Sequence, residues 1–332
     1  MITMESWMFL SSYQKLRDKL FSMQTIINLV HMPYLGKGGT SLGINFGTAA
    51  FVMSKRHIQN YTAQYDYIRY FETDDEGLPF IFPTINERYT TASVENFTRI
   101  PGSPISYWLG EKLYSIFETG LMIEDIAPVR QGFQTGDNDK FLRFWQEVNF
   151  VKIGFGYEDT ESFHNSGLKF APYNKGGEYR KWYGNNEYLV AFDEINYTLL
   201  SQMGNKLPSR QLYFKDSITW SALSSANFGA RYCGKGFTFS AKGACAFPKG
   251  EKESAIVLAI LNSCVSRKLL EFLCPTLDFN VGQLRQIPLP YKLTAETESR
   301  IVTINNLNIE ISKSDWDAFE TSWDFKRHPL LC

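Results

Sequence analysis

The sequence has little of what usually identifies a metal site, a disulfide-stabilised domain or a common enzyme class. Its five cysteines contain no Cys-x-x-Cys pair and its four histidines lie far apart, which argues against a zinc module and a disulfide framework. The Gly-x-x-x-x-Gly-Lys-Ser/Thr phosphate loop, the Gly-x-Ser-x-Gly nucleophile elbow and the His-Glu-x-x-His motif do not occur. We therefore expect neither a bound metal nor the usual hydrolase or nucleotide-binding chemistry.

Long apolar runs are also missing. The longest, Ala255 to Leu261, has seven residues, whereas a membrane span needs about 20. The first 25 residues carry five charged side chains and no uninterrupted apolar stretch of the signal-peptide kind. These absences predict a soluble, cytoplasmic protein without a membrane partner.

The chain has no large net charge, because 34 basic and 35 acidic residues leave a net charge of −1. The charges are nevertheless distributed unevenly. Residues 201–290 contain eleven Lys and Arg residues against five Asp and Glu residues, a net charge of +6, whereas residues 61–100 have a net charge of −4. A polyanionic partner is therefore expected to meet a local basic surface in the later part of the chain.

The first hundred residues are interpreted as the end of an α/β sheet. An amphipathic helix is predicted from Ser6 to about Phe21, followed by buried strands at Thr25–His31 and Gly47–Met53, with a glycine-rich loop over Pro33–Gly47 between them. The glycine-rich first turn and the other strands of a complete open sheet are not in the sequence. Residues 57–100 are acidic and aromatic and are interpreted as a connection with a strand or two.

The composition changes again after residue 100, where glycine, asparagine and aromatic residues become frequent. Short strands are predicted at Glu187–Phe192, Ile218–Leu223 and Gly236–Phe239, and helices at Lys252–Phe272 and Asp315–Lys326. This pattern is typical of a mixed α+β domain. With 332 residues, 44% of them hydrophobic, the chain is long enough for two domains with buried cores.

Two segments combine the residue types that bind nucleic acid. Residues 171–184 offer cations for phosphates, asparagine and arginine for base edges, and tyrosine and tryptophan for stacking. Residues 218–232 combine hydroxyl groups with Asn227 and Arg231 inside the basic stretch. The competing interpretation is an aromatic loop whose rings pack into a β core. Asp137 and Asp139 lack the later residues of a calcium loop, so a solvated turn is the better interpretation there.

Five segments of the chain together resemble the adenine-specific DNA methyltransferase of BREX phage-defence systems, which is related to type IIG and type I restriction-modification methyltransferases. The resemblance covers nearly the whole chain and is carried by residues 7–12, 132–143, 172–184, 218–221 and 314–329. It implies the tail of a Rossmann-like methyltransferase sheet over 1–56, a connecting segment over 57–100, a mixed α+β target-recognition domain over 101–290 and a C-terminal helical segment over 291–332.

The resemblance also implies a division of labour. Intact relatives are implied to transfer a methyl group from S-adenosylmethionine to N6 of an adenine flipped out of the duplex. The acidic, glycine-rich S-adenosylmethionine motif and the Asn-Pro-Pro-Tyr catalytic motif that the family implies do not occur in these 332 residues. We therefore expect an internal or C-terminal fragment with no cofactor and no catalytic residue of its own, inactive alone, that recognises the DNA target.

The expected partners are double-stranded DNA, the missing methyltransferase core and other defence-system proteins. The type of each residue and its place in the sequence predict which residues contact phosphates and which read bases. The phosphate contacts are Lys175, Lys181, Arg231 and Lys235. The base readers are Gln134, Asn138, Asn174, Arg180 and Asn227. Further DNA contacts are expected at Thr135, Arg143, Trp182 and Ser224. The alternative is a non-catalytic module whose 51 aromatic residues bind a carbohydrate or a protein partner.

Overall fold

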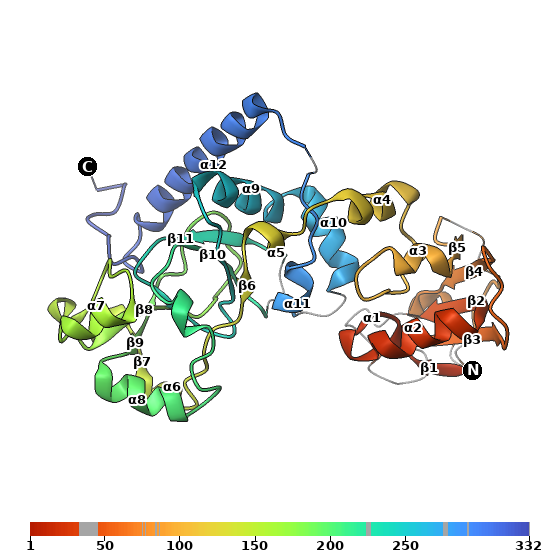
Figure 1. Cartoon of the computed structure of the whole chain (residues 1–332), viewed down its shortest axis with the longest axis horizontal. Helices are drawn as coiled ribbons and strands as arrows, with labels where there is room; N and C mark the ends of the chain where they lie inside the picture. The colour runs from red at the N-terminus through yellow and green to blue at the C-terminus, as the bar shows by residue number, and fades with distance from the viewer. Residues whose placement is uncertain are drawn as a thin grey trace. The chain divides into compact units, whose positions relative to one another are not determined.

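The computed structural model describes residues 1–32, 46–74, 76, 78–83, 85, 87–223, 227–274, 278–290 and 292–331. The predicted Pro33–Gly47 loop therefore lies almost entirely outside the described residues. The chain divides into two compact units, Met1–Gly120 and Leu121–Cys332. Figure 1 shows strands with helices against them in each unit, so the chain has the mixed α/β character that the sequence predicts.

Unit 1 is built on a five-stranded sheet of order β1-β3-β2-β4-β5. Its strands are β1 (Ile2–Met4), β2 (Thr25–Met32), β3 (Thr48–Ser54), β4 (Thr62–Tyr67) and β5 (Thr90–Ser93). The two predicted strands are confirmed as β2 and β3. Because β2 pairs antiparallel with β3 and parallel with β4, the sheet is mixed. Residues 57–100 supply β4 and β5 to the same sheet, so this segment is part of unit 1.

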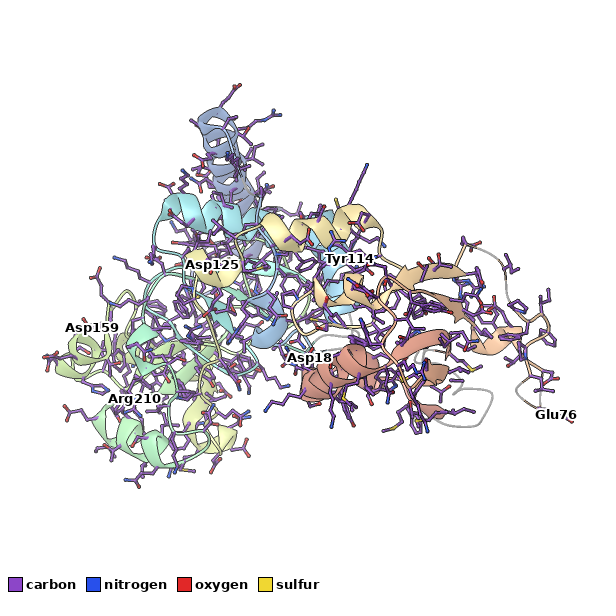
Figure 2. The ribbon with its side chains drawn as sticks, turned by 45° about the vertical axis from the view of Figure 1, so that its right-hand side comes forward. Asp18, Glu76, Tyr114, Asp125, Asp159 and Arg210 are labelled. Atoms are coloured by element: carbon purple, nitrogen blue, oxygen red, sulfur yellow. The ribbon has the colours of Figure 1, made fainter. Side chains whose placement is uncertain are left out.

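The helices of unit 1 are α1 (Ser6–Phe9), α2 (Gln14–Met23), α3 (Val94–Thr98) and α4 (Glu111–Thr119). The single helix predicted from Ser6 to Phe21 is wrong, because the chain becomes extended at Leu10. Arg17 stabilises this break: its Nη1 donates to the carbonyls of Trp7 at 2.7 Å and Leu10 at 2.9 Å. In α4, Tyr114, labelled in Figure 2, donates from its hydroxyl to the Ser106 carbonyl at 2.7 Å.

Unit 2 contains two four-stranded sheets, of order β11-β10-β13-β6 and β12-β8-β9-β7. The first consists of β6 (Val129–Arg130), β10 (Ser217–Trp220), β11 (Ala230–Cys233) and β13 (Cys245–Ala246). The second consists of β7 (Leu142–Phe144), β8 (Phe170–Asn174), β9 (Tyr188–Ala191) and β12 (Thr238–Phe239). The strands predicted near 187–192, 218–223 and 236–239 are confirmed as β9, β10 and β12, with shorter bounds.

Aromatic side chains fill the core beside the second sheet. Phe133, Phe163, Phe192 and Phe214 are fully buried, and Tyr173 from the predicted DNA-binding segment lies among them. The aromatic-core interpretation is therefore correct for this ring. Asp159, labelled in Figure 2, is the N-cap of the helix over Thr160–Asn165, which lies next to this core. Its carboxylate accepts a hydrogen bond from the Ser162 amide at 2.7 Å.

Helices of unit 2 lie against both of its sheets. They are α5 (Ile123–Ile126), α6 (Asn138–Phe141), α7 (Thr160–Asn165), α8 (Glu194–Gln202), α9 (Glu251–Leu261), α10 (Cys264–Leu273), α11 (Val281–Leu284) and α12 (Ala295–Trp316). The long α12 lies against α9, which contacts β10 and β11 (Figure 1). No helix within the described ranges is both long and apolar enough to cross a membrane.

Two helix predictions in unit 2 are corrected by the structure. The helix predicted over 252–272 is interrupted at Asn262 and Ser263, where the Asn262 amide group pairs with both backbone groups of Ala230 at 3.0 Å. The helix predicted over 315–326 is wrong, because α12 ends at Trp316. The following residues fold back so that Lys313 meets Asp317 at 2.6 Å and Asp324 at 3.0 Å.

Candidate nucleic-acid interface

Three parallel segments of unit 2 end at one edge and form a pocket there. Strand β12 pairs parallel with β8, and Phe133 forms a parallel bridge to Ser240 beyond the end of β12. The Phe133 amide donates to the Phe239 carbonyl at 3.1 Å, and the Ser240 amide donates to the Asn174 carbonyl at 2.8 Å. The carboxyl ends of parallel strands present side chains and loops at a common edge, a frequent place for ligand sites.

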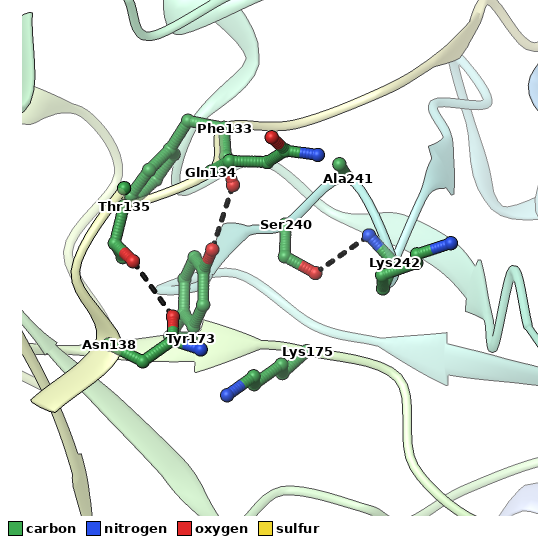
Figure 3. Close-up of a pocket in the computed structure, with 10 residues that line it drawn as sticks. Phe133, Gln134, Thr135, Asn138, Tyr173, Lys175, Ser240, Ala241 and Lys242 are labelled. Atoms are coloured by element: carbon green, nitrogen blue, oxygen red, sulfur yellow. Dashed lines mark hydrogen bonds between the residues drawn. The ribbon is translucent and has the colours of Figure 1, made fainter. Parts of the chain in front are cut away.

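We name this cavity of about 310 Å³ the Lys175 pocket (Figure 3). Its lining is Phe133, Gln134, Thr135, Gly136, Asn138, Tyr173, Lys175, Ser240, Ala241 and Lys242. Four residues that the sequence predicted as DNA contacts are thus brought together: Gln134, Thr135, Asn138 and Lys175. The lining contains two lysines and no acidic residue, a charge balance that favours an anionic ligand.

Close backbone contacts fix the loop that carries Gln134. Asn205 accepts a hydrogen bond from the Gln134 amide at 2.7 Å through Oδ1 and donates to the Gly132 carbonyl at 3.0 Å through Nδ2. Gly204 adopts a φ of +52°, and a Cβ there would lie 1.9 Å from the Gln134 carbonyl oxygen. Only glycine allows this approach without displacement of the loop. The Gln134 side chain is exposed, so the fixed loop presents its amide to solvent.

Hydrogen bonds also orient the polar groups around the pocket. The buried Thr135 hydroxyl donates to Oδ1 of Asn138 at 2.8 Å (Figure 3). Asn138 begins α6, where Asp137 accepts a hydrogen bond from the Lys140 amide at 3.0 Å as the helix cap. Asp137 therefore has a local structural role. The Tyr173 hydroxyl donates to the Phe133 carbonyl at 2.8 Å, which leaves the two rings as an apolar floor.

The charge of Lys175 depends on its surroundings. Burial lowers the pKa of Lys175, and the negative charge of Asp139 offsets part of this shift. The ammonium lies 4.7 Å from the centre of the Tyr188 ring, a cation–π contact. The second cation, Lys242, is exposed and lies 3.7 Å from Asp278. Within the described part of the chain, neither lysine is held by a short, buried ion pair, so both groups have capacity for an anion.

Two of the predicted contacts are buried in the structure. Asn174 is 5% exposed; its Oδ1 accepts from the Gly176 amide at 3.3 Å and its Nδ2 faces the Cys245 sulfur. Arg231 is 1% exposed. Its guanidinium donates hydrogen bonds to the Arg180 carbonyl and to the Ser221 hydroxyl, each with a donor–acceptor distance of 3.5 Å. These side chains belong to the interior of unit 2 in this arrangement, and we do not include them in the interface.

Four further predicted residues are exposed or half-buried but already engaged. Arg180 pairs with Asp315 at 2.9 Å and lies over the Trp316 ring at 5.0 Å. Lys235 pairs with Glu158 at 2.8 Å. Arg143 donates to the Asp139 carbonyl at 2.7 Å, and Trp182 bridges to β11 through its backbone. The predicted contact Ser224 lies outside the described residues.

The last two predicted residues, Lys181 and Asn227, line a second cavity of about 130 Å³ that we name the Arg267 pocket. Its lining is Tyr179, Lys181, Asn227, Phe228, Leu261, Asn262, Ser263, Cys264 and Arg267. Among the described residues, two cations and no acidic residue face this cavity as well. A third cavity, of about 470 Å³, has the opposite charge, with Asp216, Glu251 and Glu310 against Lys249 in its lining. We name it the Glu310 pocket.

Sequence reasoning missed Ser240, Lys242 and Arg267. Lys242 lies in the segment of net charge +6, which was the available signal, but its place in the pocket depends on the pairing of β12 with β8. The sequence predicts one helix across Arg267, whereas this residue lies in the first turn of α10, after the break at Asn262. Within the described part of the chain, no group of three or more His, Cys, Asp and Glu side chains could hold a metal ion.

Comparisons with known proteins place the chain beside two curated relatives, although no family model matches it. It is 34% identical over 349 residues to the adenine-specific methyltransferase PglX of Lacticaseibacillus casei (strain Zhang), with 100% of this chain and 28% of the relative covered. It is 31% identical over 332 residues to the adenine-specific methyltransferase BrxX of Escherichia coli O9:H4 (strain HS), with 99% and 26% covered. The chain therefore spans about a quarter of the length of these homologues.

Two solved structures align with most of the chain at low identity and with TM-scores below 0.5. The type IIL restriction-modification enzyme MmeI in complex with DNA has a TM-score of 0.48 at 10% identity, with 98% of this chain and 42% of that chain covered. The ATP-dependent type ISP restriction-modification enzyme LlaBIII bound to DNA has a TM-score of 0.42 at 10% identity, with 94% and 25% covered. The resemblance to adenine-specific methyltransferases is thus confirmed by the sequence homologues.

Proposed function

We propose that unit 2 recognises a duplex DNA target for an adenine-specific methyltransferase of the kind to which PglX and BrxX belong. The observation that carries the proposal is the Lys175 pocket, where two lysines, two exposed amide side chains and no carboxylate surround one cavity. Homology to PglX and BrxX over the whole chain supports the enzyme class. Double-stranded DNA is the polyanion on which such an enzyme would act.

The lining residues divide into two roles by their chemistry. Lysine ammonium groups contact phosphates, which fixes the position of the protein on the duplex without reading its sequence. Asparagine and glutamine amides present a donor and an acceptor together, the pattern that matches a base edge in the major groove. We therefore assign Lys175 and Lys242 to phosphates and Gln134 and Asn138 to bases. Thr135 orients the Asn138 amide through its hydroxyl.

Unit 1 is proposed to be the end of the methyltransferase sheet. Its mixed sheet with β2 parallel to β4 is compatible with the edge of an α/β fold. S-adenosylmethionine would supply the methyl group in the intact enzyme. We assign no residue of this chain to the binding of S-adenosylmethionine and derive no reaction step that involves it. The acidic, glycine-rich motif and the Asn-Pro-Pro-Tyr motif are absent from the sequence.

Separate replacement of Asn138 and Lys175 tests this division. Fluorescence anisotropy would measure binding of the full chain to a preferred duplex selected from a random pool and to a scrambled duplex. Asn138→Ala should reduce the preference between them by about 1–3 kcal/mol, roughly 5- to 150-fold. Lys175→Ala should weaken binding to both duplexes equally and lower the salt slope by about 1.

The matched control is Asn165→Ala, which removes an exposed amide at the end of α7, outside the pocket lining. It should leave both affinities unchanged. Equal losses on both duplexes for Asn138→Ala and Lys175→Ala would refute the assignment of base reading to Asn138. Salt-insensitive binding to an oligosaccharide or a protein in place of DNA would refute the function itself.

A further inference from the structure

The Arg267 pocket is built where three separate segments meet. Tyr179 and Lys181 come from the loop after β8, Asn227 and Phe228 precede β11, and Cys264 and Arg267 begin α10. Phe228 and Leu261 are buried, so the floor is apolar and fixed, whereas Tyr179, Asn227 and Arg267 are exposed. The cavity thus combines a rigid base with polar groups open to solvent.

Asn262 holds this arrangement together. Its side chain accepts from the Ala230 amide and donates to the Ala230 carbonyl, both at 3.0 Å, which joins the α9–α10 turn to β11. Its own carbonyl accepts a hydrogen bond from Nζ of Lys181 at 2.9 Å. This bond uses one of the three donors of the ammonium and positions the other two. The Lys181 charge is therefore fixed at the pocket before any ligand arrives.

Arg267 supplies the second charge. Among the described residues no carboxylate pairs with its guanidinium, in contrast to Arg180 with Asp315 and Lys235 with Glu158. A guanidinium offers a planar set of donors that matches two oxygens of a phosphate. The first backbone N–H groups of the ten-residue α10 add partial positive charge beside it. Among the described residues, the pocket thus combines a fixed ammonium with a guanidinium that has no carboxylate partner, an arrangement that favours an anion.

The Arg267 pocket lies within reach of the Lys175 pocket along the chain. Lys175 lines one cavity and Lys181 lines the other, and only six residue steps separate them. A fully extended chain covers about 3.3–3.6 Å per residue, so the two positions are at most about 22 Å apart. Because base pairs follow one another at about 3.4 Å along B-DNA, this distance corresponds to about six base pairs or fewer. One duplex is long enough to contact both pockets.

We propose that the Arg267 pocket binds a backbone phosphate of the same DNA duplex, with Lys181 and Arg267 as its ligands. This inference rests on the proposed DNA-recognition function and adds a second anchor to it. Asn227, expected from the sequence to read bases, becomes a neighbour of the phosphate. Tyr179 lies at the exposed rim of the pocket, beside the bound strand.

Cys264 provides a local readout. It is exposed and lines the pocket, whereas Cys233, Cys245 and Cys274 are buried. Burial raises the pKa of Cys245 and of Cys274 to about 12 and that of Cys233 well above its usual range, so these three thiols react slowly at pH 8. Cys332→Ser removes the thiol that lies outside the described residues. Iodoacetamide labelling of this variant, followed by mass spectrometry, reports access to the pocket.

The first measurement compares labelling of Cys264 with and without duplex DNA, while anisotropy on the same samples confirms binding. At a free duplex concentration ten times the Kd, the labelling rate should fall about tenfold, because only the free chain reacts. Inorganic phosphate at equal ionic strength should leave the rate unchanged. If DNA binds but the labelling rate of Cys264 does not fall, the inference is overturned and the proposed function is left intact. Absence of DNA binding overturns both, and protection by inorganic phosphate assigns the pocket to a free anion.

The second measurement uses Arg267→Gln, with Lys249→Gln as its matched control. Lys249 is an exposed cation in the acidic Glu310 pocket. Arg267→Gln should lower the slope of log affinity against log salt by about 1, as expected for one lost phosphate contact. Lys249→Gln should leave it unchanged. Equal slopes for both variants and the wild type would show that Arg267 contacts no phosphate. Circular dichroism melting would establish that both variants are folded.

Discussion

Two arginines, one in each unit, are equally buried and differ in how their charge is satisfied. Arg17 in unit 1 is 1% exposed and donates to the carbonyls of Trp7, Leu10 and Gly102 at 2.6–3.1 Å. Arg231 in unit 2 is also 1% exposed, but its two hydrogen bonds are 3.5 Å long and its Nε has no partner within the described structure. Burial alone therefore does not reveal what an arginine contributes.

The contrast extends to other polar groups of the two units. In unit 1, His31 connects Glu5 at 2.6 Å with the Tyr107 hydroxyl at 2.9 Å, so three polar side chains satisfy one another. In unit 2, Lys175 and Lys242 face one cavity and Lys181 and Arg267 face another, with no acid in either lining. Unit 1 uses these polar side chains to hold its own fold. The described residues of unit 2 leave these cations without a short, buried ion pair, as the proposed anion-binding role requires.

The largest effect is expected from Arg17→Met. Removal of the guanidinium breaks its hydrogen bonds to the buried Trp7 carbonyl and to the half-buried Leu10 and Gly102 carbonyls. An unsatisfied buried group costs about 1–3 kcal/mol. We expect the free energy of unfolding of unit 1 to fall by about 3 kcal/mol or more. Native-state hydrogen exchange of the β2 and β3 amides, followed by mass spectrometry, measures this change within unit 1. A loss below about 1 kcal/mol would show that the carbonyls find other partners.

A smaller effect is expected from the titration of Lys175. Because burial lowers its pKa, the ammonium loses its proton at a lower pH than an exposed lysine. Phosphate binding requires the protonated form, so DNA affinity should fall as the pH rises through this lowered pKa. Lys175→Arg keeps its charge and should retain affinity to higher pH. Asp139→Asn removes the compensating charge, and the fall should then begin at lower pH. Identical profiles for all three proteins would contradict the role of Lys175.

The smallest effect is expected from Arg231→Met. Burial lowers the pKa of Arg231 to about 10, which means that the folded state disfavours the charged form. At neutral pH the group is charged in both states, and its charge therefore opposes folding. Replacement of a poorly paired buried charge by an apolar side chain is often neutral or stabilising. The change in stability of unit 2, measured by hydrogen exchange in β10 and β11, should stay within about 1 kcal/mol. A loss as large as that for Arg17→Met would remove the contrast between the two arginines.

The sequence predicted elements whose signal is local. The β-branched, apolar run at 25–31 forms β2, and the run at 47–53 forms β3. The break between α9 and α10 was missed because the apolar periodicity continues across it, while its cause is Asn262 bonding Ala230, a residue 32 positions away. The helix predicted over 315–326 does not form, and the Trp323 ring packs on Phe155 and Phe237 from elsewhere in unit 2.

The candidate site shows the same limit. Gln134, Thr135, Asn138 and Lys175 were selected because their residue types match DNA chemistry, and the structure brings them to one pocket. Arg231 has the same chemistry but lies on β11, where Ala230 and Cys233 are also buried. Lys242 reaches the Lys175 pocket only through the parallel pairing of β12 with β8, which joins residues about 65 positions apart. Residue type selects candidates, and strand pairing decides which of them meet.

Binding of the full chain to duplex DNA across salt concentration tests the central claim most directly. Anisotropy titrations between 50 and 200 mM salt, with no methyl donor present, would compare the wild type with the Lys175→Ala/Lys242→Ala double variant. The wild type should show a steep fall of log affinity with log salt, and the double variant should lose about 2 from that slope. Salt-independent binding, or the same slope for both proteins, would contradict DNA recognition through the Lys175 pocket.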